Sequence, residues 1–501
     1  MLAELLLTAT LLAGSPHHTP PVIPDAIRAE QPDSVIKPDQ SMPVVTRHTV
    51  AAGGKMLSYE ATAGFLPVLN DAGDTEAQIF YVSYTAGAKK PDRTRPLILF
   101  LNGGPGAASV WLHLGAAGPR RVQMLPDGRL PSPPYKLVDN QSTWLEFGDL
   151  LFIDPVGTGY SRATKGDLAP KFSTQQGDMD SLIRFIRLYL TRTERWTSPL
   201  FLVGESYGGF RSAGLTEGLL EHGIALNGVL LISPVLNFQT ISFDNGNDLP
   251  YVLFLPGYTA TAWFHGRLGQ DLQANLDKSL AQAEEWAGTE YLTALARGER
   301  LTVAERDKIC AKLAKFTGLD QNFIDNRNLR IDSRSFVREL LRDKKQTVGY
   351  MDSRFIAENT DYSSPHGFDP TVATIRPPYT ATFNEYVRSE LGYRSDLEYF
   401  TLGGGIGRWE YETRNSYADT SDNLRNSLSK NPYLKVFMAT GLFDLATPHF
   451  ATDYTRNHLG LTSSQQKNIT TRRYRAGHMM YLEEGALDQL KKDVAEFILQ
   501  R

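Results

Sequence analysis

Three side chains far apart in the sequence are of the types that together carry out nucleophilic catalysis. Ser206 lies between two glycines in LVGESYGGF, in the pattern G-x-S-x-G. Asp444 lies in VFMATGLFDLATP and His478 in RRYRAGHMMYLEE. A serine hydroxyl is a weak nucleophile until a base takes its proton, and a third group must orient that base. The sequence therefore predicts a triad of Ser206, His478 and Asp444.

The pattern around Ser206 gains weight from its surroundings. Alone it is weak, because a chain with 42 glycines contains chance matches and the serine could simply occupy a glycine-rich turn. Here it directly follows the apolar run LFLV, which delivers the chain into a sharp turn that exposes the serine at the edge of a sheet. The order serine, acid, histidine is that of α/β-hydrolases.

The choice of histidine has alternatives. Of the ten histidines, His449, His458 and His478 lie beyond Asp444. His449 shares the loop of Asp444 and His458 lies in the helix-like DYTRNHLG, so either is interpreted as an ordinary surface residue. His478 follows a glycine in a loop after a strand, where a catalytic base belongs, and is therefore the favoured base.

Donors for the negative oxygen of the reaction are also predicted. One is the backbone N–H of Tyr207, directly after the nucleophile. The other is expected from the loop Asn102 to Gly106 in LILFLNGGPGAAS, where glycines let the main chain turn an N–H inward. Alone, NGGPG would be read as a turn. Its place after a buried strand indicates an oxyanion loop.

The residues around these motifs predict the elements that position them. A hairpin turning at Gly53-Gly54 and the strand AQIFYVSYTA come first. Short, continuous apolar runs then suggest central strands, and DMDSLIRFIRLYL has the spacing of an amphipathic helix. This alternation predicts an α/β fold with a mixed, mostly parallel central sheet. The runs cover residues 97–101, 150–154, 201–203, 229–232 and 436–439.

The chain is expected to divide into four parts. Residues 1–43 are interpreted as a signal and Pro-rich leader, and 44–240 as the first part of the core. Residues 241–415, where the alternation stops and helical patterns prevail, are predicted to form a helical cap insertion. Residues 416–501 complete the core.

Composition excludes several classes of function. The chain has 501 residues, 41% of them hydrophobic and 22% charged, and a net charge of −4, which favours neither nucleic acid nor an acidic membrane surface. No H-E-x-x-H motif or Cys/His cluster indicates a metal, and LGGGIGRW does not fit a dinucleotide motif, so no cofactor is expected. The single cysteine, Cys310, is interpreted as a half-buried helix residue.

The N-terminus suggests export. MLAELLLTATLLAG resembles the apolar region of a signal peptide, although it carries Glu4 and lacks a basic start; an ordinary amphipathic or disordered terminus is the alternative. We expect a periplasmic or secreted protein. No stretch has the length of apolar residues that a transmembrane segment needs.

Several stretches together resemble the serine carboxypeptidase family. LFLNGGPGAAS is similar to its W-L-N-G-G-P-G-C-S-S signature and LLFIDPVGTGYS to its L-L-F-x-D-x-P-x-G-x-G-F-S segment. GESYGG resembles G-E-S-Y-A-G, while GLFDLATP and AGHMMY resemble the aspartate and histidine blocks. The resemblance implies an α/β-hydrolase fold with a catalytic Ser206, Asp444 and His478 and with oxyanion donors at Gly104 and Tyr207.

The resemblance also implies how a substrate would be held. In this family the free carboxylate of a peptide's last residue is bound by an asparagine, a glycine and two glutamates. Three of these match Asn102, Gly103 and Glu205, but the second glutamate falls on Ala116. Positive charge from the nearby His113, Arg120 and Arg121 would compensate; the favoured interpretation is that all three are surface groups.

The function implied is a serine carboxypeptidase that acts on peptides with a free C-terminus. The missing glutamate keeps open an acyltransferase or esterase on the same fold. A catalytically inactive binding module is a third possibility, against which the intact serine, aspartate and histidine argue.

Overall fold

A ten-stranded mixed sheet forms the centre of the computed structural model, which describes residues 42–87, 92–359 and 368–500. Almost all of the predicted leader, 1–43, lies outside the described residues. The strand order is β1-β2-β3-β7-β4-β9-β10-β13-β14, with β8 paired to β3. The bounds are β1 (Val44–Ala52), β2 (Lys55–Leu69), β3 (Thr75–Ala86), β4 (Leu97–Leu101), β7 (Asp149–Ile153), β8 (Arg162–Ala163), β9 (Leu200–Glu205), β10 (Gly228–Ile232), β13 (Lys435–Gly441) and β14 (Ile469–Tyr474).

The sheet has an antiparallel end and a parallel end. The pairs β1–β2, β2–β3 and β3–β7 are antiparallel, and the predicted hairpin closes with Ala52 opposite Lys55. From β7 through β4, β9, β10 and β13 to β14 every pair is parallel. The predicted mixed, mostly parallel sheet is confirmed. Two small antiparallel pairs lie outside it, β5 (Arg120–Val122) with β6 (Leu137–Asp139) and β11 (Gln346–Val348) with β12 (Ile356–Glu358).

Each face of the sheet has its own core. In β4, Leu97, Leu99 and Leu101 belong to one hydrophobic cluster, while Ile98 and Phe100 belong to the other. Alternate side chains of a strand point to opposite faces, so a strand covered on both sides must be apolar throughout. This explains the continuous apolar runs of the sequence.

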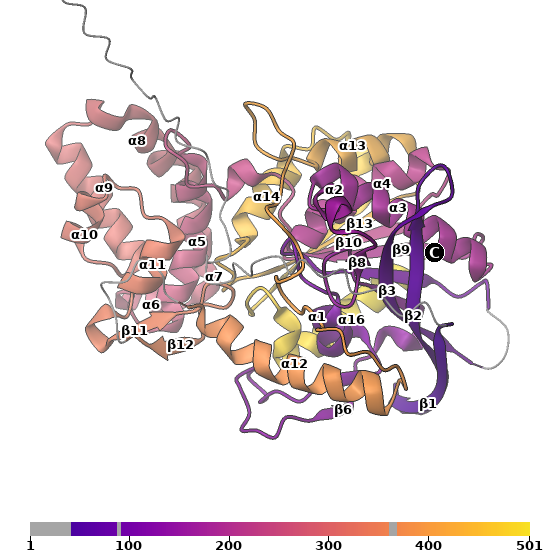
Figure 1. The fold of residues 1–501 in the computed structure, drawn as a ribbon. Coiled ribbons are helices and arrows are strands. Elements are labelled where there is room, and N and C mark those ends of the chain that lie inside the picture. The colour runs from indigo at the N-terminus through magenta and orange to yellow at the C-terminus, as the bar shows by residue number, and fades with distance from the viewer. Residues whose placement is uncertain (1–41, 88–91, 360–367, 501) are drawn as a thin grey trace, which may run out of the picture.

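Helices cover both faces (Figure 1). The first cluster includes apolar side chains of α3 (Gln175–Arg192), α4 (Tyr207–Glu221) and α13 (Ser421–Lys430). The second includes those of α12 (Pro370–Ser389) and α16 (Glu484–Leu499). Shorter helices are α1 (Val110–Leu112), the π-helical η2 (His113–Ala117), α2 (Ala169–Phe172), α14 (His449–Asn457) and α15 (Ser463–Gln466).

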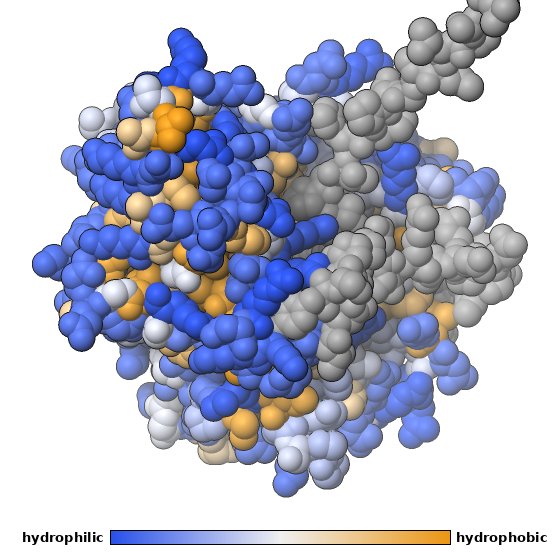
Figure 2. Space-filling model, turned by 90° about the vertical axis from the view of Figure 1, so that its left-hand side faces the viewer, coloured by the Kyte–Doolittle hydropathy of each residue, from blue (hydrophilic) through white to orange (hydrophobic). Residues whose placement is uncertain are grey.

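Most helices of the range predicted as a cap lie together beside the sheet (Figure 1). They are α5 (Leu249–Phe264), α6 (Gln270–Gln273), α7 (Leu276–Trp286), α8 (Leu292–Arg297), α9 (Val303–Thr317), α10 (Gln321–Asn326) and α11 (Ser333–Glu339). The surface of this side is mostly hydrophilic, with apolar side chains dispersed in small groups (Figure 2). Cys310 in α9 is 5% exposed, so it is fully buried rather than half-buried as predicted.

No helix in the described ranges is long and apolar enough to cross a bilayer.

Candidate active site

Ser206 occupies a strained turn between β9 and α4. Its φ of 61° and ψ of −125° lie outside the regions that non-glycine residues prefer, at a cost of about 1–3 kcal/mol. The flanking glycines make the turn possible, because a Cβ on Gly204 would lie 2.0 Å from the carbonyl oxygen of Gly208. From Leu200 to Glu217 every residue except Ser206 is buried. The turn therefore presents this one side chain to solvent.

His478 and Asp444 form a buried pair. Nδ1 of His478 lies 2.7 Å from Oδ2 of Asp444, and both side chains are nearly inaccessible. The Thr447 hydroxyl donates to the same Asp444 oxygen at 2.8 Å. Burial lowers the pKa of His478, but the charge of Asp444 and its hydrogen bond raise it more, so the pKa lies above its ordinary 6.5. The aspartate can thus fix the ring and stabilise its protonated form.

The end of β10 brings this pair to the serine. The Ser206 N–H donates to the carbonyl of Ile232 at 3.0 Å, and the next residue, Ser233, donates from its hydroxyl to the carbonyl of His478 at 2.8 Å. Within the described residues, no hydrogen bond joins Ser206 Oγ to His478 Nε2. Such bonds are often long in free enzymes and tighten with substrate bound.

The glycine-rich loop after β4 lies against the turn. A Cβ on Gly103 would be 2.6 Å from the backbone nitrogen of Tyr207 and 2.9 Å from the Ser206 Cβ. Gly104 has a φ of 105°, which favours glycine. Among the described residues, neither the Gly104 nor the Tyr207 N–H donates to another protein group. The two predicted oxyanion donors therefore lie beside the serine with their N–H groups free.

Glu205 and Asn102 meet next to Ser206. The Asn102 side-chain Nδ2 donates to Glu205 Oε1 at 3.2 Å, and its Oδ1 accepts a hydrogen bond from the Leu112 N–H. Burial raises the pKa of Glu205 to about 7, although His478, Tyr481 and Asn102 act to lower it. Near neutrality this carboxyl can thus hold a proton and donate a hydrogen bond.

A buried ion pair that was not predicted from the sequence supports the loop that begins at Asn102. Arg211 Nε lies 2.6 Å from Asp178 Oδ2, with side chains only 1% and 2% exposed. The same guanidinium donates to the carbonyl of Asn102 at 2.6 Å. A signal was available, because Asp178 precedes Leu182 by one helical turn on the apolar face of α3. An acid on such a face needs a buried partner.

The interpretation of His113 as a surface group is wrong. It is 2% exposed in η2, where Tyr84 lies 2.6 Å from its Nε2. Burial lowers the pKa of His113 to about 3, so the ring is neutral and supplies no charge. Arg120 and Arg121 are partly exposed and are paired with carboxylates, Arg120 with Asp139 and Glu390 and Arg121 with Glu484.

His449 also differs from its interpretation as a surface residue. It is fully buried at the start of α14, with its Nε2 3.3 Å from Glu284 of α7. The partner comes from a segment more than a hundred residues earlier, which the local pattern did not reveal. His458 is exposed, as expected.

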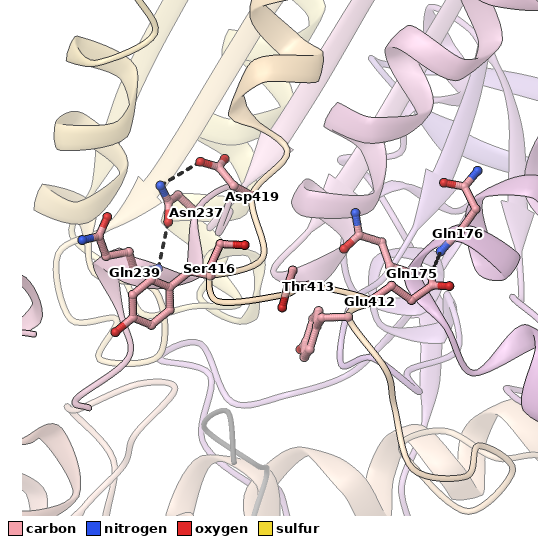
Figure 3. Close-up of a pocket in the computed structure, with 10 residues that line it drawn as sticks. Gln175, Gln176, Asn237, Gln239, Glu412, Thr413, Ser416 and Asp419 are labelled. Atoms are coloured by element: carbon pink, nitrogen blue, oxygen red, sulfur yellow. Dashed lines mark hydrogen bonds between the residues drawn. The ribbon is translucent and has the colours of Figure 1, made fainter. Parts of the chain in front are cut away.

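A polar pocket of about 620 Å³ lies near the turn (Figure 3). Tyr411, which lines it, packs edge-on against the Tyr207 ring at 6.1 Å between centroids. None of the predicted catalytic residues lines it. The lining residues come from the start of α3, the segment after β10 and the loop before α13: Gln175, Gln176, Asn237, Gln239, Tyr411, Glu412, Thr413, Ser416, Tyr417 and Asp419.

A metal centre finds no support in the described ranges, where no group of three or more His, Cys, Asp or Glu side chains could hold an ion.

A known protein family matches most of the chain. The family model described as "Serine carboxypeptidase" matches residues 53–491. Serine carboxypeptidase-like 45 of Arabidopsis thaliana is 30% identical over 203 residues, which are 39% of this chain and 40% of that protein. The pheromone-processing carboxypeptidase KEX1 of Saccharomyces cerevisiae is 33% identical over 174 residues, 32% of this chain and 22% of that one. The chain spans less than half the length of these curated relatives.

One solved structure gives the fold. It is that of the prohormone-processing carboxypeptidase KEX1(Δ)p from Saccharomyces cerevisiae, with a TM-score of 0.55 and 18% identity. The match covers 88% of this chain and 91% of that one. The predicted α/β-hydrolase fold is confirmed.

Proposed function

Because the chain belongs to the serine carboxypeptidase family, we propose that it hydrolyses the C-terminal peptide bond of peptides through an acyl-enzyme on Ser206. The observation that carries this proposal is the buried His478–Asp444 pair, held by β10 beside a strained and partly exposed serine. The substrates are peptides with a free C-terminus. No cofactor takes part in the proposed reaction.

Acylation begins when Ser206 Oγ attacks the scissile carbonyl and His478 Nε2 takes its proton. Asp444 holds the ring so that Nδ1 carries a hydrogen and Nε2 is free to accept. The negative oxygen of the tetrahedral intermediate accepts hydrogen bonds from the N–H groups of Gly104 and Tyr207.

The intermediate then collapses. The C–N bond breaks, His478 returns its proton to the leaving amine, and the last residue departs as a free amino acid. Water, deprotonated by His478, attacks the acyl-enzyme and releases the shortened peptide, which restores Ser206.

Selection of the chain end is assigned to Asn102, Gly103 and Glu205. These residues lie directly beside Ser206, and a Cβ on Gly103 would lie 2.7 Å from the carbonyl of Glu205. Protonated Glu205 donates to the substrate carboxylate, whereas ionised Glu205 would repel it. Binding of the last residue then places the preceding peptide bond over the serine.

The test compares a blocked dipeptide with a free C-terminus, its C-terminal amide and its C-terminal ester. Wild type should cleave the peptide bond of the free acid, and Ser206→Ala should lose this activity while keeping the thermal unfolding temperature. Ser212→Ala, which removes another buried hydroxyl in α4, is the control and should remain active. Full activity of Ser206→Ala would refute the proposal.

An esterase or acyltransferase is the second candidate, and Ala116 is the observation that favours it. The residue is fully buried in η2 and offers no carboxyl for the end of a peptide. Cleavage of the ester without cleavage of the free-acid peptide, or transfer of the acyl group to an added alcohol, would establish this alternative.

We also propose that the protein is exported, on the apolar stretch at residues 1–14. N-terminal sequencing of the protein from periplasmic and culture fractions tests this. A mature form that begins beyond residue 14 is expected, and an intact N-terminus confined to the cytoplasm would contradict it.

A further inference from the structure

Two buried oxygens beside the candidate active site have no hydrogen-bond partner. They are Oε2 of Glu205 and the hydroxyl of Tyr481, on side chains 3% and 2% exposed. An unsatisfied buried polar group costs free energy, so native proteins rarely keep one without a use. The Glu205 carboxyl and the Tyr481 hydroxyl shift each other's pKa, by charge and as hydrogen-bonding neighbours, and the Asn102 amide shifts the pKa of both. The three side chains therefore lie together, although neither of the two oxygens has a partner at full hydrogen-bond geometry.

The main chain of η2 is shaped to accept the Tyr481 ring. A Cβ on Gly115 would lie 2.5 Å from Cε2 of Tyr481 and 2.5 Å from the hydroxyl of Tyr379. Any side chain at position 115 would therefore push both rings away. The next residue, Ala116, has no polar group to offer. The Tyr481 ring thus packs against η2 at Gly115, next to Ala116, where the main chain carries no polar side chain.

The chemistry of this cluster suits a carboxylate. Asn102 uses one amide hydrogen for Glu205 and has another to give, and Glu205 can hold a proton near neutrality. Burial raises the pKa of Tyr481 well above 10, so the phenol keeps its hydrogen under all working conditions. Three donors at one place, beside the nucleophile, match the oxygens of one ionised carboxyl group.

We propose that Tyr481 binds the terminal carboxylate of the substrate by donating its phenolic hydrogen, together with Asn102 and Glu205. This assignment rests on the proposed function. Tyr481 then determines specificity for free C-termini, and it does so without a second carboxyl group that would have to be protonated. Only Glu205 needs a proton for binding.

Binding and turnover of Tyr481→Phe test the proposal. The ligands are a blocked dipeptide with a free C-terminal carboxylate and the same dipeptide as its C-terminal amide. Affinity is measured by calorimetry in the Ser206→Ala background, and KM and kcat are measured with Ser206 present. Loss of one hydrogen bond to a charged group should weaken binding of the free acid about 10- to 100-fold and leave that of the amide nearly unchanged. The KM for the acid should rise accordingly, with little change in kcat.

Two further variants sharpen the result. Tyr160→Phe is the matched control, because its hydroxyl is also buried and unpartnered but the ring packs against Phe80 and Tyr399. It should bind both ligands as wild type does. Gly115→Ala displaces the Tyr481 ring and should reproduce the selective loss for the acid, which keeps the test decisive if Tyr481→Phe folds poorly.

Equal weakening for acid and amide, or none for either, would overturn the role of Tyr481. The proposed function fails on a different observation, namely that wild type cleaves no peptide with a free C-terminus. If wild type cleaves such peptides and Tyr481→Phe still discriminates acid from amide as wild type does, only the assignment of Tyr481 falls.

Discussion

His478 Nδ1 lies 2.7 Å from Asp444 Oδ2, in surroundings from which water is almost entirely excluded. The Thr447 hydroxyl lies 3.2 Å from the same ring nitrogen and donates a hydrogen bond to the same Asp444 oxygen. This contact fixes which nitrogen of the ring faces the nucleophile. The proposed reaction depends on it more than on any other side-chain contact.

Asp444→Asn should therefore reduce kcat by about 10³- to 10⁴-fold, because an amide can stabilise the wrong tautomer and cannot compensate the positive ring. KM should change little. Steady-state kinetics with a blocked dipeptide measure both. Asp453→Asn, which alters a carboxylate of α14 that pairs with Arg473, is the control and should retain activity. A loss below about tenfold for Asp444→Asn would speak against the triad.

The pH profile of kcat/KM should be bell-shaped for substrates with a free carboxylate. On the acidic side activity rises as His478, whose pKa lies above 6.5, loses its proton and becomes a base. On the basic side it falls above about 7, because Glu205, whose pKa burial raises to about 7, ionises and repels the substrate. The groups that act on Glu205 are His478, Tyr481, Asp444 and Asn102. For the C-terminal amide the basic limb should disappear, and its persistence there would contradict the role of Glu205.

Stability should depend on Glu205 in the opposite sense to most acids. Its pKa is about 7 in the folded chain against an ordinary 4.5, so the folded state holds the proton more tightly and loses stability as the pH rises from 4.5 to 7. Glu205→Gln removes this penalty. Its gain in free energy of unfolding over wild type should grow by about 2–3 kcal/mol between about pH 5 and about pH 8, as denaturant titrations would measure. A gain that does not change with pH would mean that Glu205 ionises normally.

The Arg211–Asp178 pair, which holds the carbonyl of Asn102, predicts a large effect on stability. Asp178→Asn leaves a buried guanidinium without its countercharge and should cost about 3–5 kcal/mol of unfolding free energy. Asp127→Asn is the matched control, because its pair with Arg129 is 49% and 70% exposed and should contribute less than about 1 kcal/mol. Chemical denaturation of the two variants separates these cases, and equal small losses would contradict the buried role of Asp178.

The sequence predicted the parts of the fold whose signals are local. The central strands are buried on both faces, so their sequences are unbroken apolar runs. The turn at Ser206 is indicated by the glycines on either side of it. Helix α12 lies in the range predicted as a helical cap, but its local signal is weak, because Pro377 and Pro378 argue against a helix interior. Packing of Tyr379, Phe383 and Tyr386 into the second core cluster overrides that local preference.

The parts of the site that escaped prediction depend on distant partners. Tyr481 and Arg211 have no local sequence signal that reveals their place in the site. Only the fold brings the phenol over Gly115 and the guanidinium to the carbonyl of Asn102.

The most direct test of Ser206 as the nucleophile is mass spectrometry after reaction with a fluorophosphonate, which labels activated serines covalently. The adduct should lie on the peptide that contains Ser206, should be absent from Ser206→Ala, and should form more slowly in Asp444→Asn. An adduct on another serine, or labelling of Ser206→Ala at the wild-type rate, would show that the reactive residue lies elsewhere.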